Sequence, residues 1–201
     1  KSTDKTREIA RKYGARVINI KKKGFAAGRN GAFKYSKGQI IAFIDADFVL
    51  SKTVFEDAIK SFNEDPKLVC VQPFITLRMK ALPKRSIKKF KLYLKIQNIA
   101  TELSFYTKFP LPTTCVICRR DAITKSGLFR EDLDLLEDID FHRRLRRYGS
   151  YKVIRSTAKM CMRRFAKEGL FKVYVGYYLY SLIINTLGIK NKRSKLYLPI
   201  R

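Results

Sequence analysis

The strongest constraint on the fold is a run of five apolar residues, Ile40–Ile44, that leads directly into Asp45-Ala46-Asp47. A short continuous apolar run is typical of a strand that is covered on both faces. Predicted strands and helices alternate around it: strands over 15–20 and 68–71, and helices that end at Gly14 or cover 29–36 and 53–65. Thr53 and Glu56 predict a capping box at the start of the 53–65 helix. This alternation predicts an α/β fold with a mostly parallel, Rossmann-like sheet and helices on both faces.

The second half of the chain is less regular. The pattern predicts strands over 114–118 and 151–155, short helices over 121–126 and 137–148, and a basic amphipathic stretch over 87–109. Beyond residue 164 the sequence is helical in pattern and increasingly apolar. We therefore divide the chain into a core over 1–165 and a hydrophobic C-terminal helical appendage over 166–201. The first residue is Lys1, so we expect the natural start to be missing.

Charge narrows the choice of partners. Lys and Arg number 44 against 17 Asp and Glu, a formal net charge of +27 in 201 residues. This excess indicates an anionic partner, which can be a phosphate-bearing small molecule, a nucleic acid or a membrane surface. No zinc finger, helix-turn-helix or RNP pattern is recognisable, so charge alone predicts only nonspecific nucleic-acid binding. Four cysteines are too few for a disulfide scaffold and suit a reducing compartment, which predicts a cytoplasmic location.

The two aspartates after the apolar run are the first candidate site. Ligands of open α/β sheets bind at the carboxyl ends of the strands. Residues i and i+2 of an extended segment point the same way, so Asp45 and Asp47 can face one object. Two adjacent carboxylates favour a divalent cation between them, and Mg²⁺ is bound in this way together with phosphates. The alternative is that both are solvated aspartates before the Thr53 helix.

Several motifs in order resemble family 2 glycosyltransferases, which have the GT-A fold. They are Ser2-Thr3-Asp4-Lys5-Thr6, Gly28-Arg29-Asn30-Gly31-Ala32, the 38–47 segment that ends in Asp45-Ala46-Asp47, and the 136–145 segment Leu-Glu-Asp-Ile-Asp-Phe-His-Arg-Arg-Leu followed by Tyr148-Gly149. The resemblance implies transfer of a sugar from a nucleotide-sugar donor, with Mg²⁺ or Mn²⁺ holding the diphosphate. It also implies that the transfer inverts the configuration of the anomeric carbon. The family normally begins with two further strands that contribute nucleobase contacts. We therefore expect this piece to lack part of the donor site and to be inactive alone.

The resemblance also implies roles for individual residues. Asp45 and Asp47 form the metal and donor motif, with Asp47 as the direct ligand, and Arg29 and Asn30 bind near the donor. Asp138 is the general base that takes the acceptor proton, and Glu137 orients the acceptor. The alternatives are a solvated charge for Arg29 and a plain helix start for the Glu137-Asp138 pair.

Arg163 and Arg164 stand where many relatives carry a histidine ligand, and the resemblance implies that they clamp the diphosphate. An ordinary basic loop is the alternative. His142 is the single histidine of the chain, and we expect it to pack or to face solvent. Cys115 and Cys118 lack further zinc ligands nearby, so we predict buried thiols, as we do for the remaining pair, Cys70 and Cys161.

The C-terminal part contains 17 uncharged residues over 173–189, fewer than the roughly 20 of a spanning helix. A shallow membrane contact and a core or oligomer helix both remain open for it. Basic clusters at Lys84/Arg85, Lys88/Lys89 and 143–147 would strengthen attraction to anionic lipid. We expect a protein that is peripheral to, or anchored at, the cytoplasmic membrane face and that uses a lipid-phosphate or glycan acceptor. A basic nucleic-acid-binding module and a non-catalytic GT-A scaffold are the alternatives.

Overall fold

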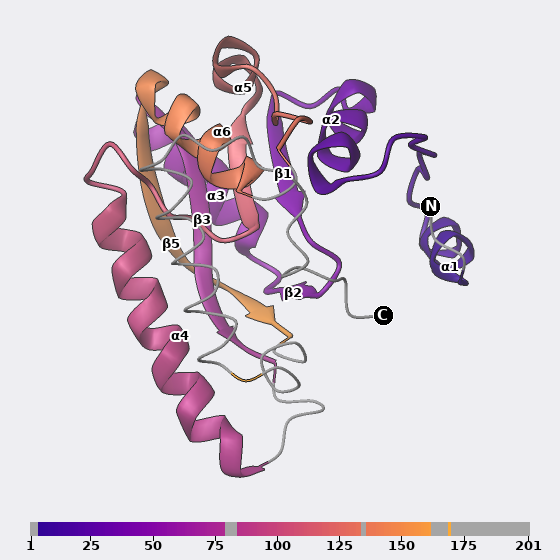
Figure 1. Ribbon diagram of the computed structural model, residues 1–201. Coiled ribbons are helices and arrows are strands. Elements are labelled where there is room, and N and C mark those ends of the chain that lie inside the picture. Colours follow the sequence, from indigo (N-terminus) through magenta and orange to yellow (C-terminus); the bar gives the residue numbers. More distant parts are fainter. Residues whose placement is uncertain (1–3, 79–83, 134–135, 162–168, 170–201) are drawn as a thin grey trace.

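The computed structural model describes residues 4–78, 84–133, 136–161 and 169 (Figure 1). Within them the helices are α1 (Thr6–Lys12), α2 (Phe25–Tyr35), α3 (Val54–Glu64), α4 (Lys84–Ser104), α5 (Arg120–Ser126), α6 (Glu137–Leu145) and the short 3-10 helix η1 (Arg146–Tyr148). The strands are β1 (Ile40–Ile44), β2 (Phe48–Leu50), β3 (Leu68–Leu77), β4 (Cys115–Arg119) and β5 (Ser150–Met160). The C-terminal helix predicted over 166–201, and with it the proposed division into core and appendage, falls on a segment of which the structure describes only Gly169, a residue without regular secondary structure.

The five strands form one sheet in the order β1-β4-β3-β5-β2. Only β3 and β5 are parallel among these neighbours, whereas β1–β4, β3–β4 and β2–β5 are antiparallel. The predicted α/β class is confirmed, but the prediction of a mostly parallel sheet is wrong. A continuous apolar run indicates that a strand is buried, but it carries no information about the direction of that strand. Here β4 inserts between β1 and β3 in the opposite direction.

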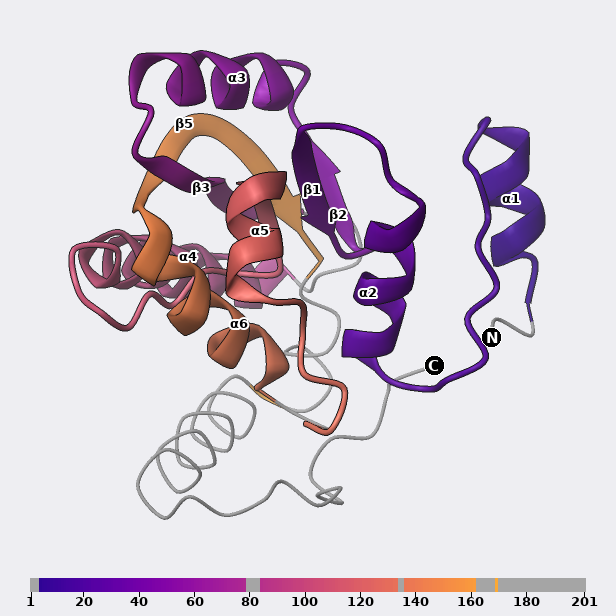
Figure 2. The same ribbon diagram turned by 90° about the horizontal axis from the view of Figure 1, so that it is seen from above.

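The predicted strand over 15–20 is absent, because this segment has no regular secondary structure. A strand requires a hydrogen-bonded neighbour. β1 is an edge strand that pairs with β4 on one side, and within the described ranges its other side has no partner. Both views place α1 away from the sheet, and none of its residues is buried (Figures 1 and 2).

Helices cover both faces of the sheet, as the sequence predicted. Figure 2 shows α3 on one side of the strands and α4, α5 and α6 on the other. The face under α3 is held by Val54, Ala58 and Phe62, which pack on apolar residues of β3, β4 and β5. A larger cluster on the opposite face joins β1 to α6 through Phe43, Phe129 and Phe141, with Phe43 edge-on to both other rings. These contacts bring the ends of β1 and α6 close together.

The predicted capping box of α3 is wrong. Thr53 makes no side-chain cap hydrogen bond, and its backbone is helical at φ −93° and ψ −1°. A capping side chain requires an extended backbone at that position.

The long helix α4 packs on β3 beyond the point where β4 ends. The Asn98 side chain completes the hydrogen bonding of β3 there: its Oδ1 accepts from the Ile75 N–H at 2.9 Å and its Nδ2 donates to the Ile75 carbonyl at 2.7 Å. Nδ2 also donates to the Leu94 carbonyl at 2.8 Å. Asn98 thus acts as a one-residue substitute for a neighbouring strand.

Candidate functional site

The Asp45-Ala46-Asp47 segment is a tight turn between β1 and β2. The Phe48 N–H donates to the Asp45 carbonyl at 3.2 Å, and the Cys161 N–H donates to the Asp47 carbonyl at 3.2 Å. The extended geometry that we predicted for this pair is therefore wrong, because β2 turns back to pair with β5. Asp45 lies at the end of β1 with its side chain partly exposed.

Arg29 of α2 connects this turn to the start of α6. Its Nη1 donates to Glu137 Oε1 at 2.6 Å, and its Nη2 approaches Asp45 Oδ1 at 3.5 Å. The guanidinium also lies over the Phe129 ring, 5.2 Å from its centre, and the side chain is only 14% exposed. The structure thus brings together three residues that the sequence motifs identified in separate segments.

The Glu137-Asp138 pair begins α6. The preceding Leu136 is buried and has a left-handed backbone, φ 62° and ψ 19°, which is unfavourable for a residue with a branched side chain. The Asp138 carboxylate accepts the Ile139 N–H at 2.8 Å. Glu137 is buried, whereas Asp138 keeps some exposed surface although protein atoms crowd its carboxylate.

Burial and neighbouring charges have opposite effects on the pKa values of Arg29, Glu137 and Asp138. Burial raises the pKa of Glu137, the charge of Asp138 adds to that rise, and Arg29 opposes it. Burial likewise raises the pKa of Asp138, with Arg29 as the main opposing charge. For Arg29 itself burial would lower the pKa, but the charges of Asp45, Glu137 and Asp138 together raise it. A carboxylate with a raised pKa is the kind of group that accepts a proton in general base catalysis.

Asn30 follows Arg29 on α2 but contacts a different partner. Its side chain clamps Phe129, donating to the carbonyl at 2.8 Å and accepting the N–H at 3.0 Å, and it also donates to Glu131 Oε1 at 2.9 Å. Lys22 pairs with the same glutamate at 2.8 Å. The observed contacts of Asn30 therefore hold the 129–131 loop against α2.

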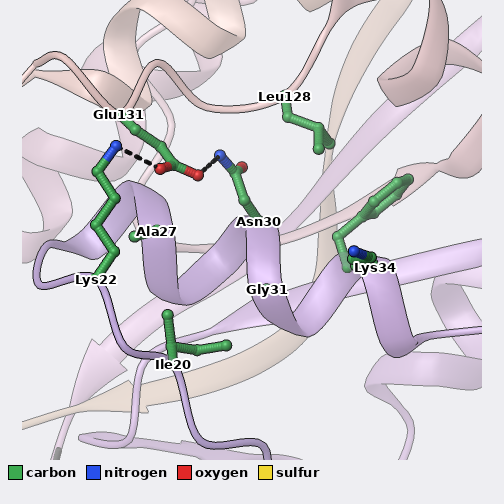
Figure 3. A pocket seen from close by; sticks show the side chains of 9 residues that line it. Ile20, Lys22, Ala27, Asn30, Gly31, Lys34, Leu128 and Glu131 are labelled. Atoms are coloured by element: carbon green, nitrogen blue, oxygen red, sulfur yellow. Dashed lines mark hydrogen bonds and ion pairs between the residues drawn. The ribbon is translucent and has the colours of Figure 1, made fainter.

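A pocket of about 470 Å³ lies beside these contacts (Figure 3). Ile20, Ala27, Phe33 and Leu128 form much of its wall, and Lys22, Lys34 and Glu131 add charge. Asn30 is the one predicted site residue among the residues that line it, so Asp45, Glu137 and Asp138 lie outside this pocket.

The residues predicted to be structural are mostly buried. Cys70, Cys115 and Cys118 are buried, as predicted, whereas Cys161 is only partly buried. Burial, with a smaller effect of Asp45, raises the pKa of Cys115 to about 12, so this thiol stays protonated beside the site. His142 is buried and its Nδ1 lies 2.9 Å from the Tyr151 hydroxyl, which decides between the two alternatives left open for it.

Comparison with known proteins assigns the family. The model of the family described as "Glycosyl transferase family 2" matches residues 1–127. The chain belongs to glycosyl transferase family 2. The resemblance expected from the ordered motifs is thereby confirmed.

Two solved structures share the fold of this family 2 chain, and one curated protein matches part of its sequence. A glucosyl-3-phosphoglycerate synthase from Mycobacterium tuberculosis superposes with a TM-score of 0.59 at 16% identity, over 96% of this chain and 68% of that one. A mannosyltransferase from Pyrobaculum calidifontis, PcManGT, gives 0.63 at 14% identity, over 97% and 55%. The minor teichoic acid biosynthesis protein GgaB of Bacillus subtilis (strain 168) is 35% identical over 60 residues, which are 29% of this chain and 7% of that protein.

The metal expected for a family 2 site can be tested against the donor atoms present. Within the described ranges, no group of three or more His, Cys, Asp or Glu side chains is arranged to hold a metal ion. Magnesium bound with a nucleotide commonly takes only one or two carboxylates and completes its shell with phosphate oxygens and water. The Asp45-Ala46-Asp47 turn, with two partly exposed aspartates separated by one residue, fits that mode.

The predictions for Arg163 and Arg164 and for the apolar segment over 173–189 fall on residues outside the described ranges. None of the helices in the described part of the chain is long and apolar enough to cross a membrane. The motifs did not predict the role of Phe129, which only its contacts with Asn30 and Arg29 identify. Leu136 begins the 136–145 motif, but nothing in the sequence predicted its left-handed backbone.

Proposed function

We propose that this family 2 domain transfers a sugar from a nucleotide-sugar donor to an acceptor at the junction of β1, α2 and α6. The observation that carries the proposal is the Arg29 side chain, which contacts Asp45 at the end of β1 and Glu137 at the start of α6. The residues are 16 and 108 positions apart from Arg29 in the sequence. A largely buried cation in contact with two acidic motifs supports the proposal that the expected donor and acceptor groups belong to one site.

The donor end of the site is assigned to Asp45 and Asp47. Structures with this fold support the assignment: the Mycobacterium tuberculosis synthase was crystallised with Mn²⁺ and UDP-glucose, and PcManGT with GDP-mannose and Mn²⁺. Asp47 and Asp45 would hold Mg²⁺ or Mn²⁺, and the ion would neutralise charge on the departing diphosphate. Arg29 adds fixed positive charge, and Asn30 would help by holding the 129–131 loop.

The acceptor end is assigned to Asp138 and Glu137. Asp138 would remove the acceptor proton as the hydroxyl attacks the anomeric carbon, and its raised pKa favours proton uptake. Glu137 would orient the acceptor while Arg29 keeps its carboxylate charged. Inversion by single displacement follows from the family resemblance. Arg163 and Arg164 would clamp the diphosphate.

The acceptor itself is proposed to carry phosphate or to be a glycan. The net charge of +27 favours a phosphate-bearing acceptor, including a lipid phosphate, at an anionic membrane surface. One neighbour with this fold was crystallised with UDP-glucose and glycerol 3-phosphate, and the GgaB relative is a teichoic acid biosynthesis protein. A peripheral location on the cytoplasmic membrane face would suit such an acceptor.

Calorimetric titration tests the donor assignment. The protein in its natural length is titrated with UDP, GDP and dTDP, each with and without Mn²⁺. We expect one nucleotide to bind in a Mn²⁺-dependent manner, and Asp47→Ala to weaken that binding at least tenfold. Glu56→Ala removes the same charge from the exposed side of α3 and should leave binding unchanged.

Two outcomes would contradict the proposal. Equal binding of all three nucleotides and of an unrelated polyanion, insensitive to Asp47→Ala, would indicate the nucleic-acid-binding module that the +27 charge alone allows. The second outcome is metal-dependent nucleotide binding with no sugar transfer, both in the unaltered protein and in Asp138→Asn. That result would indicate a non-catalytic scaffold.

A further inference from the structure

Helix α4 has two apolar faces. One packs on the sheet through Phe90 and Leu94, which are buried among residues of β3, β4 and β5. The other face carries a row of four apolar residues at spacings of four, three and four, which places them on one side of a helix. We call this row the outer stripe: Leu92, Ile96, Ile99 and Leu103, each between 50% and 63% exposed.

The outer stripe is unusual for a helix that covers a sheet. The outward face of such a helix is normally polar, and single exposed apolar residues need no explanation, but a contiguous row indicates an interaction surface. The stripe spans Leu92 to Leu103 of the helix Lys84–Ser104. Beyond the end of α4, Tyr106 and Phe109 are also exposed, and the Arg143 guanidinium lies over the Phe109 ring, 4.9 Å from its centre.

Lysines accompany the stripe at its N-terminal end. Lys88, Lys89, Lys91 and Lys95 are all exposed, and the first turn of α4 contains no acidic residue. A long lysine side chain beside an apolar row is suited to a boundary between apolar and aqueous phases.

We propose that the outer stripe of α4 docks the domain on an anionic lipid bilayer. The apolar side chains would enter the interfacial region, and the lysines would lie among the lipid headgroups. A second copy of the chain is a poorer occupant, since four lysines against the single Glu102 give each face a net positive charge and two such faces repel. The same charge argues against a basic partner protein.

This inference deepens the membrane contact included in the proposed function by naming the surface responsible. Its test requires neither a nucleotide sugar nor transfer. Failure of vesicle binding and failure of nucleotide binding are therefore separate results.

Vesicle flotation gives the first test. The full chain is mixed with vesicles of phosphatidylcholine alone or of phosphatidylcholine with phosphatidylglycerol, at low and at high salt. We expect binding to the anionic vesicles, weakened by salt, and at least tenfold weaker binding for the double variant Ile96→Glu/Ile99→Glu. The matched control is Phe55→Glu/Ile59→Glu on α3, which adds the same charge at residues that are 49% and 52% exposed. The control should bind as the unaltered chain does.

A fluorescent reporter gives the second test and separates the stripe from other apolar segments. The chain contains no tryptophan, so Ile99→Trp introduces a single indole on the stripe, and Ile59→Trp introduces one on α3. With anionic vesicles, the reporter at position 99 should shift to shorter wavelength and be quenched by brominated lipid. The reporter at position 59 should do neither.

Three outcomes would overturn the proposal. The first is equal flotation of the Ile96→Glu/Ile99→Glu variant and its α3 control, with circular dichroism showing both folded. The second is a reporter at position 99 that brominated lipid does not quench. The third is a dimer in light scattering without vesicles that becomes a monomer in Ile96→Glu/Ile99→Glu, which would assign the stripe to a second copy.

Discussion

Arg29 is a largely buried cation with three carboxylates around it, those of Asp45, Glu137 and Asp138. Its charge lowers the pKa of both Glu137 and Asp138, against the effect of burial. A buried carboxylate that lost this partner would retain the full burial effect and take up a proton more readily. The ionisation state of the proposed base therefore depends on a residue of another helix.

Replacing Arg29 should move the pH dependence of transfer. In Arg29→Gln we expect the acidic limb of kcat/KM to shift to higher pH, because the base must lose its proton against burial without the neighbouring charge. The pH–rate profile measures this shift. Arg130→Gln, which removes an exposed arginine paired with Asp132, serves as the control and should keep the original limb. An unchanged limb in Arg29→Gln would show that neither Glu137 nor Asp138 governs it.

His142 gives a second pH effect, on stability. Burial, with a smaller contribution from Arg29, lowers the pKa of His142 to about 3, from 6.5 when unfolded. Below pH 6.5 the unfolded chain binds a proton at His142, whereas the folded protein does not. The contribution of the neutral imidazole to stability is therefore complete above about pH 6.5 and is lost as the pH falls toward 3.

The prediction is a pH-dependent difference between two proteins. For each pH unit below 6.5, the unaltered protein should lose about 1.4 kcal/mol of unfolding free energy relative to His142→Gln. Urea unfolding at several pH values measures it. Tyr151→Phe removes the hydroxyl partner of His142 but keeps the buried imidazole, so it should keep the slope. A gap that is constant with pH would contradict the prediction.

The sequence motifs identified Arg29, Asp45 and Glu137 as candidates, and their spacing could not show that one guanidinium joins the other two. Such a contact depends on how α2 and α6 pack, and packing is not encoded locally. The Asn30 clamp on Phe129 and the left-handed Leu136 were invisible for the same reason. The carboxylates of the turn were predicted on an extended backbone, which the pairing of β2 with β5 prevents.

At the scale of elements, hydrophobic pattern located most helices and strands but not their neighbours. β1 was predicted with its observed bounds, and β3 and β5 extend further than predicted, to Leu77 and Met160. The pattern carried no information on strand direction, so the sheet was predicted as mostly parallel. The 15–20 segment has the composition of a strand but no strand beside it, and pairing decides the outcome.

Asn98 allows a test of the element that substitutes for a missing neighbour of β3. Asn98→Ala removes hydrogen bonds to both backbone groups of Ile75 and leaves them buried, so we expect destabilisation of about 3 kcal/mol. Denaturant unfolding measures the loss. Glu102→Ala, on the exposed side of the same helix, should change stability by less than about 0.5 kcal/mol. Equal effects of the two substitutions would remove the special role of Asn98.

For the whole molecule, the excess of 44 basic over 17 acidic residues is the dominant property. Like charges at this density repel one another across the surface, and compaction increases that repulsion. The ion pairs that the structure does show, such as Arg29 with Glu137, use only a small part of the positive charge.

Salt should therefore stabilise the folded protein. Raising sodium chloride from about 0.01 M to about 0.15 M shortens the screening length from about 30 Å to about 8 Å. We expect the thermal unfolding midpoint to rise over this range, measured by circular dichroism, while an uncharged osmolyte at equal osmolality serves as the comparison. A midpoint that falls with salt would mean that attractive pairs outweigh the general repulsion.

The unpartnered side of β1 has a consequence for handling the domain. Along Ile40–Ile44 the backbone amides and carbonyls on that side have no partner within the described residues, and the side chains beside them are apolar. Such a rim can accept a foreign strand by the same hydrogen bonds that build a sheet, and it does so more readily at high concentration. A preparation of these 201 residues should therefore tend to aggregate through pairing of β1 edges. A short β-forming peptide that pairs with β1 should reduce this aggregation.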